Sequence, residues 1–441
     1  MRFRASAVAD GVGGTLRGED VEVDGVTIDS RTGSAGCLFV PIVAGRDGHD
    51  FVGNAVAAGA SAYLSSKGVV LDERVPVIEV NDTARALLDI GLLARRHLGD
   101  RVVGITGSVG KTSTKDLLAA VLATTWETAA SERSFNNELG VPLTLANAAE
   151  DTEAVVVEMG ARAHHHISVL CAIARPTIGV VTAVAPAHLQ MFGTVEEVAK
   201  AKGELVEALP AHGAAVLNGD DPLVSAMSAR ASARVVTFGR GRHTDVRAEA
   251  VRVADDLRTC FRLVSEWGSV MVELAVHGEH HVSNGLAAAA AGLVCGVELE
   301  AVAAGLSHAH LSSMRMELVR TPSGAVLLND AYNANPTSTH AALEALARLP
   351  AERRTAVLGP MAELGPDADQ LHADVADYAR RLGVRTITVA AQEYGVGTAD
   401  AVGSAAEARD RLGPLGPGDA VLVKGSRVAG LERLCQSLLE P

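Results

Sequence analysis

Short runs of β-branched residues alternate along the chain with stretches rich in alanine and leucine, a pattern typical of α/β proteins. In the first part of the chain, apolar runs predict strands at 26–28, 37–41, 61–65 and 76–80. A long helix is predicted next over 82–97, with Asp82 as its N-cap. The polar residues 99–101 that follow this helix indicate a domain boundary.

The rest of the chain repeats this pattern with one exception. Further apolar strands are predicted at 101–106, 154–158, 178–182, 214–218, 235–238, 325–329, 355–358, 386–390 and 420–423. Helices are predicted at 112–125 and 283–295. The exception is 245–277, where alternating positions without a helix predict an antiparallel extension at a sheet edge. We therefore expect three α/β domains, at 1–99, 100–313 and 314–441.

Composition narrows the class of protein. The 441 residues are 48% apolar and 21% charged, which is the profile of a globular chain with several domains. A formal net charge of -14 argues against a general binder of nucleic acid or anionic membranes, because both are polyanions. The first residues lack the apolar run of a signal peptide, and the longest apolar stretch, 286–297, is too short to span a bilayer. We expect a cytoplasmic protein without membrane insertion.

The five cysteines are scattered along the chain and form no Cys-x-x-Cys pair. This spacing gives no support for a zinc site or a redox pair. We expect the thiols to act as small buried apolar side chains in a reducing compartment. They are Cys37, Cys171, Cys260, Cys295 and Cys435.

The segment 104–113 joins a predicted strand to a predicted helix, and it carries the residues of a phosphate-binding loop. In that context, backbone N–H groups and the helix N-terminus can hold a polyphosphate. Gly107 and Gly110 would let the backbone approach the phosphates. Lys111 would neutralise their charge, and Thr112 would offer its hydroxyl to Mg²⁺. The first glycine of the strict P-loop pattern is missing, so a structural glycine turn remains the alternative, but ATP binding is favoured.

Three further side chains could act near this loop. Glu158 ends an apolar strand, where it would face the ligand crevice of an open α/β sheet as a Mg²⁺ ligand, although a solvated strand-end charge is equally supported. His188 follows the next strand and could be a second metal ligand, but a lone histidine there is more often structural. Composition alone predicts that Lys202 is solvated on a helix. The histidine run 164–166 is expected to be a surface feature.

Six motifs occur in an order that resembles the Mur ligases. They are TGSVGKT at 106–112, SFNNELG at 134–140, VEMG at 157–160, AH at 187–188, FG at 192–193 and NDAYNANP at 329–336. Two blocks of the third segment, 358–365 and 423–427, and the N-terminal segments 29–31 and 45–51 add to the resemblance. It covers nearly the whole chain, and the ordered set is highly specific.

This resemblance implies an α/β fold of three domains, with a central parallel-sheet P-loop ATPase domain and a Rossmann-like C-terminal domain. The first domain would bind a UDP-sugar, the second ATP and the third an incoming amine. The implied enzyme is an ATP- and Mg²⁺-dependent ligase that forms a carbon–nitrogen bond through an acyl phosphate. The motifs fit best those members that join D-alanyl-D-alanine to UDP-N-acetylmuramoyl-tripeptide in peptidoglycan synthesis. The partners implied are these small molecules and no nucleic acid, and we expect a monomer.

The resemblance also assigns roles to residues by motif. The nucleotide-binding residues are Gly107, Ser108, Gly110, Lys111, Thr112, Ser113, Asn284, Arg315 and Asp330. The metal ligands are Thr112, Glu158, His188 and Lys202, and the catalytic residues are Lys111, Lys202 and His188. The substrate-binding residues are Ser30, Arg31, Asn136, Asn137, Tyr332, Asn333 and Asn335. Lys202 matches a lysine that is carbamylated in several members, which reverses the prediction from composition. The roles of Lys424 and Arg427 stay open.

Two alternatives to this function remain open. Ala183 and Gln190 replace residues that are common at these positions in the family, which favours a Mur-type ligase recruited to a specialised metabolite with a different acid and amine. The second alternative is a non-catalytic nucleotide-binding protein. The intact set of motif residues argues against it, and amine-dependent release of ADP would separate the two classes.

Overall fold

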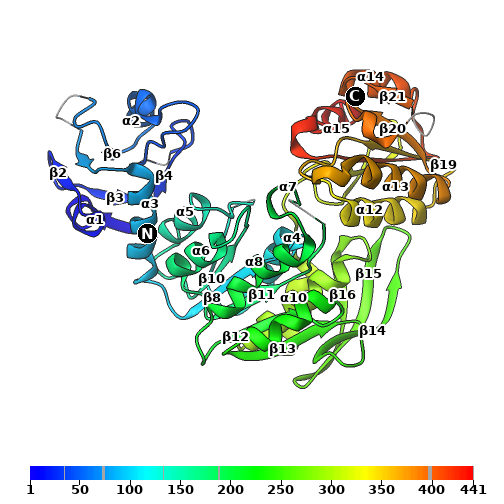
Figure 1. Cartoon of the computed structure of the whole chain (residues 1–441), viewed down its shortest axis with the longest axis horizontal. Helices are drawn as coiled ribbons and strands as arrows, with labels where there is room; N and C mark the ends of the chain where they lie inside the picture. The colour runs from blue at the N-terminus through cyan, green and yellow to red at the C-terminus, as the bar shows by residue number, and fades with distance from the viewer. Residues whose placement is uncertain (34, 72–74, 133, 187–188, 396–399, 441) are drawn as a thin grey trace.

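The computed structural model describes residues 1–33, 35–71, 75–132, 134–186, 189–395 and 400–440. Its three larger sheets lie in three separate domains, as Figure 1 shows. The N-terminal and C-terminal domains stand at opposite ends of the central domain, so the molecule has the outline of an open crescent (Figure 1). The predicted α/β architecture of three domains is confirmed.

The N-terminal sheet has five strands in the order β2-β7-β6-β5-β4, and all but β2 run parallel. The strands are β2 Thr15–Arg17, β4 Val26–Thr27, β5 Leu38–Phe39, β6 Ala62–Ser65 and β7 Val77–Glu79. A small ribbon of β1 Arg2–Arg4 and β3 Glu22–Asp24 accompanies the helices α1 Ala5–Val12, α2 Val52–Ala57 and α3 Thr83–Arg95. Asp82 caps α3 as predicted, because its carboxylate accepts the amides of Ala84 and Arg85.

The central sheet has nine strands in the order β16-β15-β14-β13-β12-β11-β8-β10-β9. The strands are β8 Arg101–Thr106, β9 Thr128–Ala130, β10 Ala154–Glu158, β11 Ile178–Val181, β12 Ala214–Asn218, β13 Arg234–Gly239, β14 Val246–Val253, β15 Arg258–Ser265 and β16 Gly268–His277. The strands from β14 to β9 run parallel, whereas β14, β15 and β16 pair antiparallel at one edge. The predicted antiparallel extension is confirmed.

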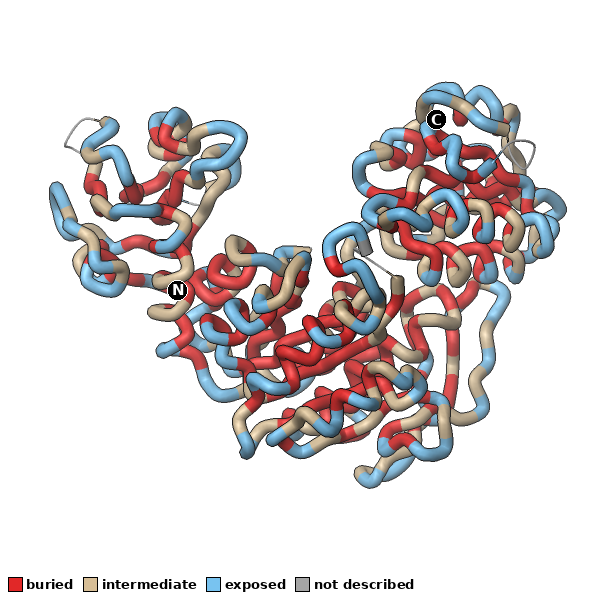
Figure 2. The backbone as a smooth tube through the Cα atoms, viewed as in Figure 1, coloured by how far each residue is buried: buried red, intermediate tan, exposed pale blue. Residues whose placement is uncertain are grey.

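Helices cover both faces of the central sheet, which explains why its inner strands are mostly apolar. Val103 packs with α4 and α10 on one face, and Val102 packs with α6 and α8 on the other. Figure 2 shows the resulting buried layer across the middle of the domain. The helices are α4 Lys111–Leu122, α5 Gly140–Ala146, α6 His166–Ala174, α7 Leu189–Phe192, α8 Val195–Glu207, α9 Pro222–Ser225, α10 His281–Val294 and α11 Leu299–His308.

The C-terminal sheet has six strands in the order β17-β18-β22-β19-β20-β21, and all but β17 run parallel. The strands are β17 Glu317–Arg320, β18 Val326–Asp330, β19 Arg353–Leu358, β20 Arg385–Val389, β21 Asp400–Val402 and β22 Asp419–Lys424. The helices are α12 Pro336–Arg348, α13 Ala368–Arg381, α14 Ala405–Leu412 and α15 Glu432–Leu439. Asp330 and Lys424 end the neighbouring strands β18 and β22, which places both side chains at one edge of the sheet.

The cysteines and the apolar helices follow most of the expectations from composition. Cys260 is only half-buried, so the prediction of burial is wrong there, whereas the other four cysteines are buried and all five thiols are free. Within the described residues, no helix combines the length and apolar character that crossing a membrane requires.

Candidate active site

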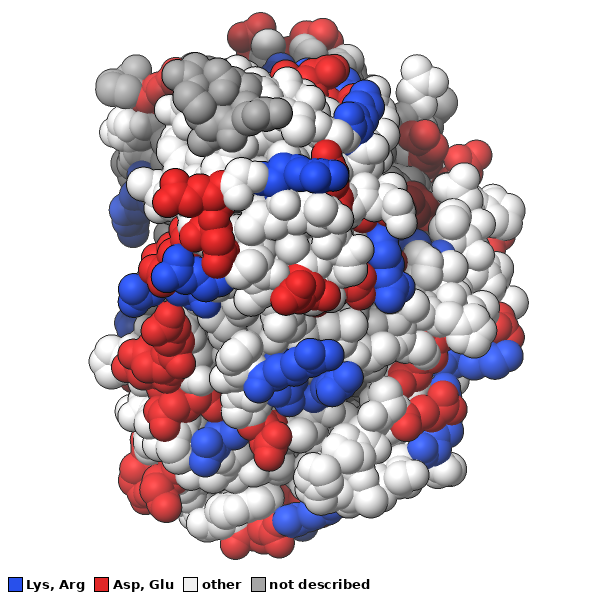
Figure 3. Space-filling model, turned by 90° about the vertical axis from the view of Figure 1, so that its left-hand side faces the viewer, with Lys and Arg blue, Asp and Glu red and all other residues white. Residues whose placement is uncertain are grey.

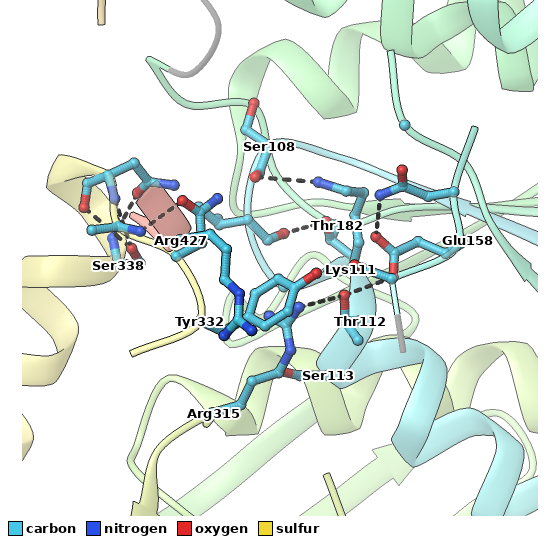
Figure 4. Close-up of a pocket in the computed structure, with 18 of the residues that line it drawn as sticks. Ser108, Lys111, Thr112, Ser113, Glu158, Thr182, Arg315, Tyr332, Ser338 and Arg427 are labelled. Carbon is cyan, nitrogen blue, oxygen red and sulfur yellow. Dashed lines mark hydrogen bonds between the residues drawn. The ribbon is translucent and has the colours of Figure 1, made fainter. Parts of the chain in front are cut away.

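A cavity of about 970 Å³ lies between the central and C-terminal domains. The phosphate loop and the start of α10 line its central side, and the segments 330–338 and 424–428 line the other. Figure 4 shows these side chains converging from separate elements. The predicted site residues that line it are Ser108, Gly110, Lys111, Thr112, Ser113, Asn136, Asn137, Glu158, Lys202, Asn284, Arg315, Asp330, Tyr332, Asn333 and Asn335.

The phosphate loop, 107–110, connects β8 to α4. Gly107 and Gly110 have positive φ angles of 145° and 82°, a conformation that favours glycine. A Cβ atom at Gly107 would collide with the Thr182 hydroxyl, and one at Gly110 would collide with the side-chain oxygen of Asn284. Glycine is therefore needed at both positions for the loop to fit against these side chains. Gly110 is also among the cavity-lining residues.

Lys111 is the first residue of α4, and its ammonium group folds back over the loop. Its Nζ donates to the carbonyl oxygens of Gly107 at 2.7 Å and Ser108 at 3.4 Å. Burial lowers the pKa of Lys111, while the nearby carboxylate of Glu158 acts in the opposite direction. The ammonium group of Lys111 therefore lies on the loop, and within the described chain its hydrogen-bond partners are backbone oxygens only.

Thr112 lies between a carboxylate and a guanidinium group, as Figure 4 shows. Its hydroxyl donates to Glu158 Oε2 at 2.6 Å and accepts from Arg315 Nη2 at 2.9 Å. The second carboxylate oxygen of Glu158 accepts from the Asn136 amide at 2.8 Å, and the Glu158 backbone N–H donates to Ser131 Oγ at 3.1 Å. Glu158 is only 1% exposed, so the alternative of a solvated strand-end charge is wrong.

The two lysines of α8 have opposite environments. The Lys200 side chain is 68% exposed, whereas Lys202 is 1% exposed and lines the cavity. Burial, assisted by the charge of Lys111, lowers the pKa of Lys202 to about 7. No hydrogen bond joins its amine to another of the described residues. The prediction from composition is therefore wrong for Lys202.

Two polar pairs belong to the C-terminal side of the cavity. The Tyr332 hydroxyl shares a hydrogen bond with the Ser134 hydroxyl of the central domain, and the Arg315 guanidinium lies 4.2 Å from the centre of the Tyr332 ring. Asp330 accepts from Lys424 Nζ at 2.5 Å. Lys424 is 2% exposed, so its charge is paired inside the domain.

Several predicted substrate asparagines also support the backbone. Asn335 is the N-cap of α12 and forms a capping box with Ser338. The carbonyl of Asn333 accepts from Lys424 Nζ at 2.9 Å, and the side chain of Asn137 accepts an amide at the start of α5 at 3.0 Å. Each of these asparagines lines the cavity while it fixes the element that carries it.

Asn284 lies beneath the phosphate loop on α10 and is 8% exposed. Its side-chain oxygen accepts from Thr114 at 3.4 Å, and its amide donates to His281 Nδ1 at 3.0 Å. Burial lowers the pKa of His280 to about 4 and that of His281 well below its ordinary value. Both histidines line the cavity, and sequence reasoning missed them. Their position at the start of a predicted helix was the available signal.

Among the described residues, the predicted site residues Gly107, Ser30 and Arg31 are not among those that line the cavity. Ser30 and Arg31 belong to the N-terminal domain and are not among the lining residues. The exposed Arg31 pairs with Asp29 at 2.8 Å, and this guanidinium lowers the pKa of Asp29 to about 2. His188 lies outside the described residues.

In the histidine run 164–166, His165 is exposed, as predicted for a surface feature, whereas His166 lines the cavity. His164 Nε2 lies 2.8 Å from Glu197 Oε2, and His166 Nδ1 lies 3.6 Å from Glu138 Oε1. Among the described residues there is no group of three or more histidine, cysteine, aspartate or glutamate side chains that could hold a metal ion.

The charge of the cavity differs from that of the chain. Acidic residues outnumber Lys and Arg by 53 to 39 overall, and Figure 3 shows both signs interspersed over the N-terminal face. In the cavity, the cations outnumber the carboxylates. The cations are Lys111, Arg162, Lys202, Arg315, Lys424 and Arg427, and the carboxylates are Glu138, Glu158, Asp330 and Glu363. This local excess of positive charge suits an anionic ligand.

Comparisons with known proteins agree with this geometry. Family models match residues 22–95 (Mur ligase family, catalytic domain), 105–292 (Mur ligase middle domain) and 314–427 (Mur ligase, glutamate ligase domain). The chain is 40% identical to the UDP-N-acetylmuramoyl-tripeptide--D-alanyl-D-alanine ligase of Mycobacterium tuberculosis H37Rv, over 94% of this chain and 92% of that protein. It is 36% identical to the ligase of the same name from Escherichia coli K12, over 99% and 98%.

A solved structure shows the same arrangement of domains. The crystal structure of MurF from Acinetobacter baumannii superposes with a TM-score of 0.89 at 28% identity, covering 100% of this chain and 99% of that one. Three family models, full-length relatives and this fold all agree. The chain belongs to the Mur ligase family.

Proposed function

We propose that this chain is the ATP-dependent ligase that joins D-alanyl-D-alanine to UDP-N-acetylmuramoyl-tripeptide in the synthesis of peptidoglycan precursors. The observation that carries the proposal is the meeting, in one cavity, of the phosphate loop, the buried Thr112–Glu158 pair and the polar segment 330–335. Relatives at 36% and 40% identity that are named for this reaction align over nearly the whole chain.

The chemistry requires activation of a carboxylate. An oxygen of the terminal carboxylate of the tripeptide bonds to the γ-phosphorus of ATP, and ADP leaves. The amine of the dipeptide then attacks the acyl carbon, an amide forms, and phosphate leaves with loss of the amine proton. Several anionic oxygens approach one another in these steps, so Lys111 and Arg315 act by offsetting their charge.

Thr112 and Glu158 are suited to Mg²⁺, because Mg²⁺ prefers oxygen ligands and these two oxygens lie 2.6 Å apart in the lining of the cavity. With His188 and Lys202, they form the proposed metal ligands. Bound Mg²⁺ would offset the charge of the phosphates. Asn136 and Ser131 hold Glu158 in place for this role through its side chain and its backbone.

Lys202 is proposed to react with CO₂. A pKa of about 7 leaves much of its amine neutral and nucleophilic near neutral pH. Attack on CO₂ forms an N–C bond and releases a proton, which gives a carbamate. That change replaces a buried amine by an anionic oxygen ligand, and cations that line the cavity, such as Lys111, would stabilise it.

The remaining sites follow the proposed domains 1–99, 100–313 and 314–441. Gly107, Ser108, Gly110, Ser113, Asn284 and Asp330 contact the nucleotide, Ser30, Arg31, Asn136 and Asn137 contact the UDP-linked acid, and Tyr332, Asn333 and Asn335 contact the dipeptide. We place the reaction in the cytoplasm, where ATP is available, and propose that a monomer carries it out.

The alternative of a ligase recruited to another acid and amine is not favoured. Its sequence support was the replacement of residues at Ala183 and Gln190. Ala183 lines the cavity, and Gln190 lines a separate cleft of about 680 Å³ beside the C-terminal domain. The close similarity of full-length relatives named for the cell-wall reaction outweighs these two positions.

The decisive experiment measures ADP release with Mg²⁺-ATP, UDP-N-acetylmuramoyl-tripeptide and D-alanyl-D-alanine, omitting each substrate in turn. We expect release only with all three, together with a UDP-pentapeptide identified by mass. Binding of ATP without turnover of this acid and amine would contradict the proposed substrates, and other acid–amine pairs would then be screened. Absence of both binding and turnover would contradict the ligase itself.

A further inference from the structure

A buried ion pair lies one turn beyond the phosphate loop, and the proposed reaction gives it no role. Lys115 is 3% exposed, and its Nζ lies 2.6 Å from Asp116 Oδ1. The Asp116 side chain is itself 10% exposed. Burying two charges has a desolvation cost that their attraction offsets only in part, so such a pair is a weak device for stability alone. Its position on α4 suggests another role.

Lys115 holds the segment on which Glu158 rests. Its Nζ donates to the backbone carbonyl of Ser131 at 2.8 Å. The hydroxyl of Ser131 accepts the backbone N–H of Glu158 at 3.1 Å. The same segment continues to Asn136, whose amide donates to the Glu158 carboxylate at 2.8 Å. Lys115 therefore holds the backbone of Ser131, the residue that supports the Glu158 backbone.

Asp116 holds the linker to the C-terminal domain. Its Oδ2 accepts the backbone N–H of Ser312 at 2.7 Å. Ser312 lies between α11 and β17, in the chain that joins the two domains. Three residues later, Arg315 donates to Thr112 at 2.9 Å. Asp116 therefore fixes the start of the short segment that brings Arg315 back to the phosphate loop.

The contacts close into a ring that starts and ends at Thr112. From Thr112 it passes through Glu158, Ser131, Lys115, Asp116, Ser312 and Arg315. We propose that Lys115 and Asp116 are positioning residues, which hold Glu158 and Arg315 on the two sides of the Thr112 hydroxyl. This inference rests on the proposed function, because Thr112 and Glu158 are there assigned to Mg²⁺ and Arg315 to the nucleotide.

The two residues have separable effects. Loss of Lys115 would release Ser131 and Asn136, so it would weaken the metal side of the site. Loss of the Asp116 side chain would release Ser312, so it would weaken the placement of Arg315. A pair that only stabilises the fold would change neither selectively. The distinguishing quantity is therefore the Mg²⁺-dependent part of nucleotide affinity, together with local protection of the two segments.

The first test uses Lys115→Met in the full-length protein, since methionine fills a similar volume without charge. ADP affinity is measured by calorimetry with Mg²⁺ and again with EDTA, and neither the acid nor the amine is present. We expect the Kd for ADP in Mg²⁺ to rise about tenfold, the size typical for loss of a residue that supports a metal ligand. The Kd in EDTA should change less than about twofold. Because no acid or amine is used, the outcome is independent of the proposed substrates.

The second test uses hydrogen–deuterium exchange of Asp116→Ala and Asp116→Asn. The alanine variant should exchange faster in 311–316, whereas Lys115→Met should exchange faster in 134–137. Asparagine keeps an oxygen that can accept the Ser312 amide, so Asp116→Asn should restore most of the protection of 311–316. Protection that is equal in all three variants and the wild type would overturn the proposal.

Arg353→Met is the control for loss of an ion pair away from the site, although the Arg353 side chain is 67% exposed. It removes a pair in the C-terminal domain in which Arg353 Nε lies 2.5 Å from Asp419 Oδ1, and Asp419 is 6% exposed on its side chain. Neither residue lines the cavity. The control should leave Mg²⁺-ADP affinity unchanged. The positioning role is wrong if Lys115→Met weakens ADP binding equally with and without Mg²⁺. It is also wrong if Lys115→Met weakens ADP binding no more than Arg353→Met does. If Lys115→Met does not fold, the exchange pattern of the Asp116 variants decides.

Discussion

The central domain meets its N-terminal neighbour through an apolar core that continues across the junction. Leu87 and Ile90 of α3 are fully buried in the same cluster as Val141 of α5 and Ile173 of α6. Arg95, at the end of α3, donates to the carbonyl of residue 174 at 2.7 Å, so the central helix α6 and α3 are also joined by a buried hydrogen bond. This junction resembles the interior of one domain.

The junction with the C-terminal domain is polar by comparison. Tyr332 pairs with Ser134 beside the cavity, and Arg348 of α12 lies 2.7 Å from Glu279 of the central domain. Leu257 of the central domain is nevertheless buried in the same apolar cluster as Leu328 and Leu343 of the C-terminal domain. Polar groups can exchange a partner for water at little net cost, whereas separating an apolar core exposes its whole area. From this difference we expect the N-terminal junction to stay fixed and the C-terminal junction to open and close over the nucleotide.

The largest expected effect is loss of turnover from a change at the polar junction. Lys111→Ala removes the cation that lies on the phosphate loop, and no other ammonium group is bonded to that loop within the described residues. We expect ADP release to fall by about a thousandfold or more, because charge stabilisation is the main contribution to phosphoryl transfer. Lys200→Ala, at an exposed lysine, is the control. Near-normal turnover of Lys111→Ala would contradict the site assignment.

The next largest effect is expected at the apolar junction, as a decrease in the free energy of unfolding. Leu87→Ala leaves a cavity between α3 and the central domain, and we expect the free energy of unfolding to fall by about 3 kcal/mol. Urea unfolding measures this change. Val428→Ala is the contrasting variant, since Val428 lies beside the cavity but is 81% exposed, and its unfolding free energy should change by less than about 0.5 kcal/mol. If both variants lost the same free energy of unfolding, the apolar junction would not be more important for stability than the cavity side, and the contrast between the junctions would be wrong.

A smaller, pH-dependent effect is expected at Lys202. Its pKa is about 7 in the folded protein and near 10.5 in the unfolded chain, so between these values the unfolded state binds more protons. Stability conferred by the wild-type lysine, relative to Lys202→Met, should therefore rise as pH increases from 7 towards 10. Unfolding in CO₂-free buffers at pH 7, 8 and 9 measures it, with Lys200→Met as the matched control. A difference that stays constant with pH would contradict the buried, titrating amine.

The fold was largely predictable, because strands and helices here follow local apolar patterns. Asp82 was identified as an N-cap from its residue type and position, and the structure confirms it. The P-loop was also recognisable from spacing. The difference in exposure between Lys200 and Lys202 could not be predicted from the sequence. The two lysines are two residues apart in the same composition, and they differ only in the helix face that the fold buries.

The supports of the site were harder to predict than its motif residues. Ser131 lies 27 positions before Glu158, and Ser312 lies 196 positions after Asp116, so no local pattern connects either pair. His188 remains a prediction from resemblance, because it lies outside the described residues. Contacts of this kind depend on sheet order and on the path of the linker, and those emerge only once the chain is folded.

The smallest expected effect concerns the ion pair that crosses the polar junction. Glu279 contacts Arg348 of the C-terminal domain and Arg240 of its own domain, each at 2.7 Å, and all three side chains are partly exposed. Glu279→Gln should therefore change the free energy of unfolding by less than about 1 kcal/mol. It should nevertheless broaden the distribution of domain orientations, because a charged contact between the two domains is lost. Small-angle scattering without nucleotide measures that spread as a larger radius of gyration.

Glu266→Gln provides the matched control for this last change. Glu266 pairs with Arg234 inside the central domain, so its loss should leave the scattering curve unchanged. A Glu279→Gln curve identical to that of the control would mean that the ion pair does not hold the domains. A large loss of stability would instead mean that the polar junction behaves like the apolar one. An increase in the radius of gyration with little loss of stability would support a junction whose contacts can open without unfolding either domain.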